Sequence, residues 1–592
     1  MKPNKSLRIL TTSIGAISAL LLLSVPASAA TGTWNGPTLT GNWDTTDTNW
    51  TGLAAGTPWA AQGNSAVFNT ADNVVTVTTN VFTDGLSISS SGNKVTVNAG
   101  QTVTQNVSNT AFLIFGAGHT NNATGNTLTI DGTYLFGPTA NASDTLVLGG
   151  DNAGGASSYN GIVVNAGGLF RHVTSAGGTR NDKIGLEVGA DYNYVDINGG
   201  TFDRQSNQRL VVGGHGSNNY MTIRNGGTFT GSSSMATSWG GTGNRVLHIG
   251  ESTQGGTGTG GSNNSVTVNG STSSARISQV LVVGNGSTAN NNFMKIENGA
   301  DVFVAFSGNT SGIGYSAGGA DNYIEVTGVG STLNVSDALN ATRFFTIGNN
   351  AAADDNHLDV FSGATADLRT GLILGNASAT DSSFNLGNGT GTSTALVGSL
   401  AVGGTAINLA HSSARLNFNG GKLVANISGT LVTGPGEIEL VGAGEIESHA
   451  SGSTVTTAIS GTGSLTKGGS GTLTLSSGSI SYLGNTSILN GTLSISTPYL
   501  ANAASVYMTT GGIFNLNTGA SDTIGGLYFD GLLQAAGTWG STASGATNQN
   551  DTFFSGNGVL NVVPVPEPTS LALLALGAFG ILGRRRTVQG RR

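Results

Sequence analysis

A pattern that recurs along the middle of the chain limits its fold more than any other feature. In each copy an Asn stands two residues before the first of two alternating apolar residues, and a Gly follows the strand. The Asn residues are Asn93, Asn126, Asn160, Asn193, Asn219, Asn264, Asn292, Asn322 and Asn356. Alternation with a period of two predicts short strands that bury one face.

A second pattern, apolar-x-apolar-Gly, precedes most copies of the first one, and a polar insert of variable length separates the two. Its glycines are Gly149, Gly189, Gly213, Gly250, Gly284, Gly314, Gly348 and Gly375, and we expect positive φ angles there. One predicted strand of this kind is Leu186-Glu187-Val188. Repeats that vary only in an insert indicate a solenoid whose coils pack on their neighbours. We therefore expect an all-β chain folded as a right-handed parallel β-helix.

The recurring Asn residues have an architectural interpretation and a functional one. Amide side chains stacked at the strand spacing of about 4.8 Å can bond from coil to coil, because each holds donors and an acceptor. We expect such a ladder to include Asn193, Asn219, Asn264, Asn292, Asn322 and Asn356. The alternative is that these amides bind a sugar or a metal ion.

Composition excludes several classes of protein. The 95 glycines show no Gly-X-Y period, which excludes collagen, and 37% hydrophobic residues is too many for a disordered tract. The absence of Cys excludes disulfides, thiolate metal sites and a Cys nucleophile. Between the two ends, 15 basic residues face 31 acidic ones, so nucleic acid is an unsuitable partner.

The N-terminus has the order of a secretory signal peptide. Lys2, Lys5 and Arg8 precede an apolar run, and Ala27 and Ala29 form a small-residue cleavage site. We expect export through the Sec translocon and cleavage after Ala29. An uncleaved membrane anchor is the alternative, although the apolar run is short for one.

The C-terminus carries a second signal in three parts. Pro566, Glu567 and Pro568 precede an uncharged apolar stretch, and Arg584, Arg585 and Arg586 follow it directly. The stretch predicts a short hydrophobic helix that inserts transiently into the membrane, with the arginines on the cytoplasmic side.

This tail closely resembles the PEP-CTERM sorting signal. The resemblance implies recognition and removal by an exosortase, a membrane-embedded protease, and delivery to the cell surface or extracellular matrix of a Gram-negative-type bacterium. A plain C-terminal anchor is the alternative.

Residues 459–495 contain Leu465-Thr466-Lys467-Gly468 and related runs, and resemble the autotransporter-associated β-strand repeat. That family implies a β-helical passenger, but the chain ends in the sorting tail where an autotransporter has its barrel. The predicted organisation is listed in chain order: signal peptide 1–29, Trp-rich cap 30–90, β-solenoid 91–440, repeat region 441–562 and sorting signal 563–592.

Four tryptophans gather early in the mature chain, at Trp34, Trp43, Trp50 and Trp59, together with Phe68. The open end of a solenoid exposes core and unpaired backbone, so we expect these side chains to form a lid there. A platform on which carbohydrate stacks is the alternative.

No grouping of residues in the sequence predicts a catalytic site, a metal or a cofactor. The pairs Asp354-Asp355 and Asp182-Lys183 are placed in polar inserts, Arg204 and Arg209 beside a turn, and Asp196, Glu325 and Asp359 on outward strand positions. The histidines are scattered without metal-ligand spacing: His119, His172, His215, His248, His357, His411 and His449.

The sequence therefore favours a non-enzymatic, adhesin-like or structural surface protein that contacts exopolysaccharide. A secreted polysaccharide lyase or hydrolase is the alternative, because such enzymes are also built on parallel β-helices.

Overall fold

The computed structural model describes residues 30–563, except 35–39, 47–48, 52–58, 60–63, 106–111, 116–122, 138–144, 151–155, 174–180, 206–208, 232–245, 252–260, 307–310, 317, 338–343, 398–404 and 518–519. The predicted signal peptide and the predicted C-terminal helix lie outside these residues. The described residues form strands and one short 3-10 helix, η1 (Asn376–Ser378). No helix among them is long and apolar enough to span a membrane.

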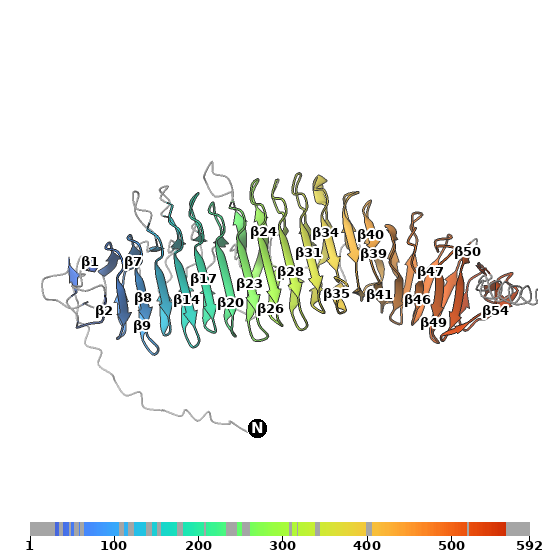
Figure 1. Cartoon of the computed structure of the whole chain (residues 1–592), viewed down its shortest axis with the longest axis horizontal. Coiled ribbons are helices and arrows are strands. Elements are labelled where there is room, and N and C mark those ends of the chain that lie inside the picture. The colour runs from blue at the N-terminus through green and yellow to red at the C-terminus, as the bar shows by residue number, and fades with distance from the viewer. Residues whose placement is uncertain are drawn as a thin grey trace, which may run out of the picture.

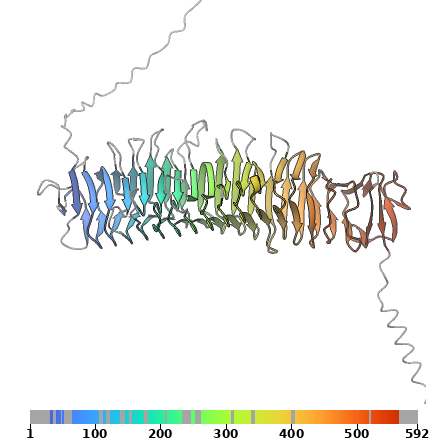
Figure 2. The same ribbon diagram turned by 90° about the horizontal axis from the view of Figure 1, so that it is seen from above.

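The chain winds into an elongated parallel β-helix, as predicted, and the helix has three faces. Figures 1 and 2 show the coils following one another in chain order along the long axis, with the strands across it. From β5 to β45, each coil contributes a strand to sheet B, then to sheet C, then to sheet A, and the later coils contribute strands to sheets C and A. Each of these strands pairs with its counterpart in the next coil, almost always in parallel.

Sheet B holds β2 (Thr40–Trp43), β5 (Val74–Val77), β8 (Lys94–Val97), β11 (Thr127–Ile130), β14 (Gly161–Asn165), β17 (Tyr194–Asn198), β20 (Tyr220–Arg224), β23 (Ser265–Asn269), β25 (Phe293–Glu297), β28 (Tyr323–Thr327), β31 (His357–Phe361), β34 (Ser383–Leu386), β37 (Arg415–Phe418), β40 (Glu437–Leu440) and β43 (Ala458–Gly461).

Sheet C holds β6 (Val81–Thr83), β9 (Thr102–Gln105), β12 (Thr133–Phe136), β15 (Leu169–Val173), β18 (Thr201–Gln205), β21 (Thr228–Thr230), β24 (Ser274–Asn285), β26 (Asp301–Phe306), β29 (Thr332–Asp337), β32 (Thr365–Leu368), β35 (Ser393–Val397), β38 (Gly421–Ala425), β41 (Gly444–Ser448), β44 (Leu465–Gly468), β46 (Thr486–Ile488), β48 (Ser505–Met508), β51 (Gly526–Phe529) and β52 (Leu532–Leu533).

Sheet A holds β1 (Ala30–Trp34), β3 (Trp50–Thr51), β4 (Asn64–Phe68), β7 (Gly85–Ile88), β10 (Phe112–Phe115), β13 (Thr145–Leu148), β16 (Asp182–Ile184), β19 (Arg209–Val212), β22 (Val246–Glu251), β27 (Gly312–Ile313), β30 (Phe344–Ile347), β33 (Gly371–Leu374), β36 (Thr405–Leu409), β39 (Gly429–Thr433), β42 (Ser453–Val455), β45 (Thr472–Leu475), β47 (Gly491–Ile495), β49 (Gly512–Leu516) and β55 (Phe554–Ser555). The 12-residue strand β24 continues from sheet C into sheet A.

The core is a continuous apolar column inside the three sheets. Val266 and Val268 on β23 point inward and are fully buried, as are Met294 and Ile296 on β25. A single coil could bury almost none of this surface alone, so burial depends on stacking. The parallel stack extends beyond the predicted segment 91–440 in both directions.

The Asn side chains form a hydrogen-bonded ladder where each coil enters sheet B. In one step, the Asn219 backbone N–H and Nδ2 donate to Oδ1 of Asn264, at 2.8 and 3.2 Å. Asn264 donates in the same way to Asn292, at 2.9 and 3.0 Å. The same bonds connect all the predicted members, and the ladder also includes Asn73, which the repeat pattern did not reveal.

The ladder ends after Asn356, where Ser382 takes the next position. Its hydroxyl is buried and has no hydrogen-bond partner among the described residues. The serine side chain is too short to accept the two bonds that an Asn accepts.

A glycine near the end of the sheet A strands from β13 to β27 lies against a side-chain amide of the ladder. Gly284 has a φ of 75°, and a Cβ atom there would overlap the side-chain amide of Asn322. One expected strand of this pattern was wrong. Leu186-Glu187-Val188 lies in a turn, and Val188 is exposed. The sheet A strand of this coil is β16, which ends at Ile184. Gly185, directly after it, is the glycine that lies against the ladder.

Both ends of the stack are closed by antiparallel pairs. At the start, β3 pairs antiparallel with β1, and Trp34, Trp43, Trp50 and Trp59 are buried against one another. Their burial supports the lid and contradicts an exposed carbohydrate platform. At the far end, β52 folds back on β51, and a small sheet holds β50 (Ser521–Ile524), β53 (Gly537–Gly540), β54 (Asn548–Gln549) and β56 (Val559–Val562).

Replacing Asn264 by Ala should destabilise the solenoid by about 2–5 kcal/mol, because two buried donors of Asn219 lose their acceptor. Chemical denaturation measures the loss, and hydrogen exchange at the Asn219 amide locates it. The control is Asn388→Ala, whose side-chain hydrogen bonds are all exposed. Equal effects of the two changes would contradict the ladder's role.

Replacing Gly284 by Ala should destabilise more than replacing Gly100 by Ala. Both residues have positive φ, at 75° and 77°, so both changes carry a backbone penalty of about 1–2 kcal/mol. Only Gly284 has a neighbour that a Cβ would strike, since nothing lies within 4 Å at Gly100. Denaturation of the two variants side by side isolates the clash with Asn322.

Candidate ligand-binding face

The ladder residues cannot serve as ligands in the folded protein. Asn193, Asn219, Asn264, Asn292, Asn322 and Asn356 are all fully buried. Their oxygens accept bonds from the preceding Asn, and their side-chain nitrogens donate to the next Asn or to turn carbonyls. The geometry supports the architectural interpretation of these residues.

A charged cluster lies inside the solenoid, although the sequence patterns predicted no charged residues in the core. Asp182 Oδ2 is 3.0 Å from Nδ1 of His172 and accepts a 2.6 Å bond from Nε of Arg204. All three side chains are at least 98% buried, and the Leu146 amide donates to Asp182 Oδ1 at 3.0 Å. Asp182 therefore lies on a strand facing the core, and the expectation that it lies in an insert is wrong.

The charges of this cluster compensate one another inside the core. Burial alone would raise the pKa of Asp182, but His172 and Arg204 outweigh it and lower the pKa to about 2. The carboxylate stays charged and neutralises a buried guanidinium, which would otherwise destabilise the core.

A second charged cluster lies on the outer side of sheet A. Arg209 Nη1 donates to Glu251 Oε1 at 2.7 Å, and His248 Nδ1 lies 3.2 Å from Glu251 Oε2. Asn285 contacts His248 at 3.3 Å. Burial lowers the pKa of nearby Lys183, while Glu251 and Glu187 oppose this shift. These residues come from adjacent coils, so the register of sheet A brings them together.

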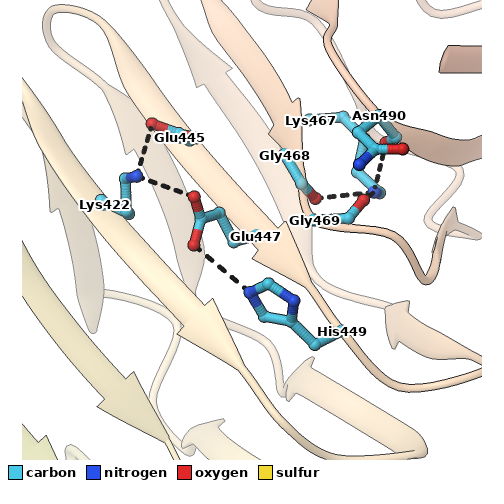
Figure 3. A network of polar contacts seen from close by, with 8 residues as sticks. All are labelled: Lys422, Glu445, Glu447, His449, Lys467, Gly468, Gly469 and Asn490. Atoms are coloured by element: carbon cyan, nitrogen blue, oxygen red, sulfur yellow. Dashed lines mark hydrogen bonds and ion pairs between the residues drawn. The ribbon is translucent and has the colours of Figure 1, made fainter. Parts of the chain in front are cut away.

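A third network lies on sheet C (Figure 3). Lys422 Nζ lies between Glu447, at 2.7 Å, and Glu445, at 3.4 Å, and His449 contacts the other oxygen of Glu447 at 3.4 Å. These groups are partly exposed and paired on the surface, a type of contact that contributes about 0–1 kcal/mol.

The same view shows that Lys467 differs from Lys422. It occupies a core position of β44, and its Nζ donates to the carbonyls of Gly468, Gly469 and Asn490 at 2.7 to 2.9 Å. Burial lowers its pKa to about 8, opposed by Glu447. Lys467 thus satisfies turn carbonyls that a core aliphatic residue would leave unpaired.

A column of aromatic side chains lines part of the outer face of sheet B. Tyr194 stacks on Tyr220 with centroids 5.4 Å apart, and Phe293, Tyr323 and His357 stack at 5.1 and 5.0 Å. All five occupy the first outward position of their strands. Aromatic residues at this position gave no periodic signal in the sequence, because their spacing follows coils of unequal length.

Ion pairs run beside this aromatic column. Arg224 makes a two-bond pair with Asp196, at 2.9 and 2.8 Å, and Lys295 lies 3.2 and 3.7 Å from Glu297 and Glu325. Burial and neighbouring charges raise the pKa of Tyr220 and of Tyr323, which keeps both hydroxyls protonated as donors. Sheet B therefore offers aromatic surface and paired charged groups together.

The acidic residues considered as catalytic candidates are spread over several coils, although Asp354, Asp355 and Asp359 belong to the same one. Asp355 is largely exposed in the turn directly before the ladder residue Asn356. Its slight burial and the nearby carboxylates of Asp321, Asp381 and Asp354 raise its pKa. Asp354 Oδ1 accepts the Thr380 amide at 2.8 Å. Asp359 contacts His357 and Asn385. Within the described ranges, no group of three His, Asp or Glu residues could hold a metal ion.

Replacing Asp182 by Asn should destabilise the protein by about 3–5 kcal/mol at pH 7, because buried Arg204 loses its counter-ion. The lowered pKa means that Asp182 stabilises the fold above pH 3.8, and that this is lost as the pH falls towards about 2. Denaturation at several pH values should show a steeper acid loss in the parent than in the variant. The control is Asp367→Asn, which breaks an exposed pair with Arg369.

Comparison with known families finds one match. The PEP-CTERM protein-sorting motif matches residues 564–586, which include Pro566, Glu567, Pro568 and Arg584 to Arg586. These residues and the predicted cleavage residues Ala27 and Ala29 lie outside the described part of the chain. No curated protein matches the chain significantly. The motif begins two residues after β56 ends, and marks an exported chain sorted to the surface through an exosortase-type membrane enzyme.

Proposed function

We propose that the protein is a non-enzymatic surface or matrix component, an adhesin-like β-solenoid whose side face contacts exopolysaccharide. The observation that carries the proposal is the junction of a long capped solenoid with a sorting motif directly behind its terminal cap. An elongated stack of this kind presents long outer faces on which a polysaccharide can bind.

The arrangement of charges supports a binding or structural role. The cluster around Asp182 is buried in the core, and Lys422, Arg224 and Lys295 are engaged in ion pairs on the outer faces. A secreted polysaccharide lyase or hydrolase remains the alternative. Turnover of glycans by the purified full chain would favour it.

The sorting step can be tested in a host that carries an exosortase. We expect the parent chain to lose its tail and appear on the surface, and the Glu567→Ala variant to stay unprocessed in the membrane. Intact mass and cell fractionation measure both outcomes. The control is Thr587→Ala, just outside the matched residues 564–586. Unchanged processing of Glu567→Ala, or equal processing in a host that lacks the exosortase, would contradict the proposal.

A further inference from the structure

The aromatic column on sheet B has a break of one coil. In the register of the sheet, Tyr220 on β20 pairs with Ser265 on β23, and Ser265 pairs with Phe293 on β25. Ser265 therefore stands where its neighbours carry rings. Tyr220 and Phe293 are two strand spacings apart, about 9.6 Å.

The rings on either side do not close this break. Tyr220 stacks on Tyr194, and Phe293 stacks on Tyr323, each on the side away from Ser265. No ring contact joins Tyr220 to Phe293 in the described part of the chain. Tyr220 is 37% exposed, which places it among the exposed large hydrophobic residues of the molecule.

The floor of the break consists of short hydroxyl side chains. Beside Ser265, the next outward position of β23 is Thr267, and the same position of β20 is Thr222. Larger side chains lie on both sides of these hydroxyl groups. They are the Arg224–Asp196 pair on one side and Lys295 with Glu297 on the other. Because short side chains lie between larger ones, we infer a shallow depression across sheet B that is one coil wide.

We propose that this depression binds one pyranose ring of a neutral glycan, held between Tyr220 and Phe293 above Ser265. This inference rests on the proposed function and names its binding site. The stacked rings of this column lie 5.0 to 5.4 Å apart, so two spacings of about 4.8 Å leave room for one ring between two others. The apolar C–H faces of a pyranose ring pack on aromatic faces, while its hydroxyls need hydrogen-bond partners.

The charges around the depression favour a neutral glycan over an acidic one. Arg224 is neutralised by Asp196, and Lys295 is shared between Glu297 and Glu325, so the border carries one more acidic than basic group. The body of the chain is strongly acidic as well. An acidic polysaccharide would be repelled by both, whereas hydroxyls can bond to paired ions and to the threonines.

The test measures binding of cellohexaose to the purified full chain by calorimetry, with polygalacturonate and N-acetyltryptophanamide as comparison probes. We expect cellohexaose to bind and polygalacturonate to bind at least tenfold more weakly. Ser265→Tyr should weaken cellohexaose binding at least tenfold, because the new ring completes the stack. Tyr220→Ala should weaken it as well, by removing one wall.

The matched control is Ser383→Tyr. Ser383 follows His357 in the same aromatic column, so the new ring extends the stack elsewhere and leaves the break open. Cellohexaose binding by this variant should equal that of the parent. Absence of cellohexaose binding, equal binding by Ser265→Tyr, or binding of N-acetyltryptophanamide alone would overturn the proposal. None of these binding results depends on tail processing. The glycan site can therefore be disproved without affecting the proposed sorting step, and the sorting step without affecting the site.

Discussion

From Asn73 to Asn356 the structure depends on one requirement: each coil must satisfy its buried backbone donor where it enters sheet B. The ladder meets this requirement with a side chain from the following coil, since Asn264 Oδ1 accepts the backbone N–H of Asn219. Each coil is thus completed by the next one. Apolar burial drives the stacking, but it is not directional, and the amide bonds fix the position of each coil on its neighbour.

Much of the fold could be predicted because ladder and core repeat in the sequence. Asn residues and alternating apolar residues identified the sheet B strands from β8 to β31. The apolar-x-apolar-Gly pattern identified the sheet A strands β13, β19, β22, β24, β27, β30 and β33. Sheet C was not separated out, because its strands have no fixed residue at one end. The strand at Asp182–Ile184 was missed since a buried Asp interrupts its apolar pattern.

The charged clusters and the candidate site could not be predicted for a different reason. His172, Asp182 and Arg204 lie on three strands joined by segments of unequal length, so their proximity depends on register. The break at Ser265 is visible only when its neighbours are aligned coil by coil. A serine in a polar, Thr-rich sequence carries no signal of its own.

The glycine beside the ladder limits how such a protein can change its length. Gly284 closes one coil, yet the side chain it accommodates belongs to Asn322, whose strand β28 lies two strands beyond β23 in sheet B. The same relation joins Gly314 to Asn356, and Gly348 to Ser382. A duplicated or deleted coil must therefore bring a turn and an entry residue that suit coils further along the stack. Recombination between coils inside the Asn ladder preserves this match, whereas recombination across the Asn356–Ser382 step does not.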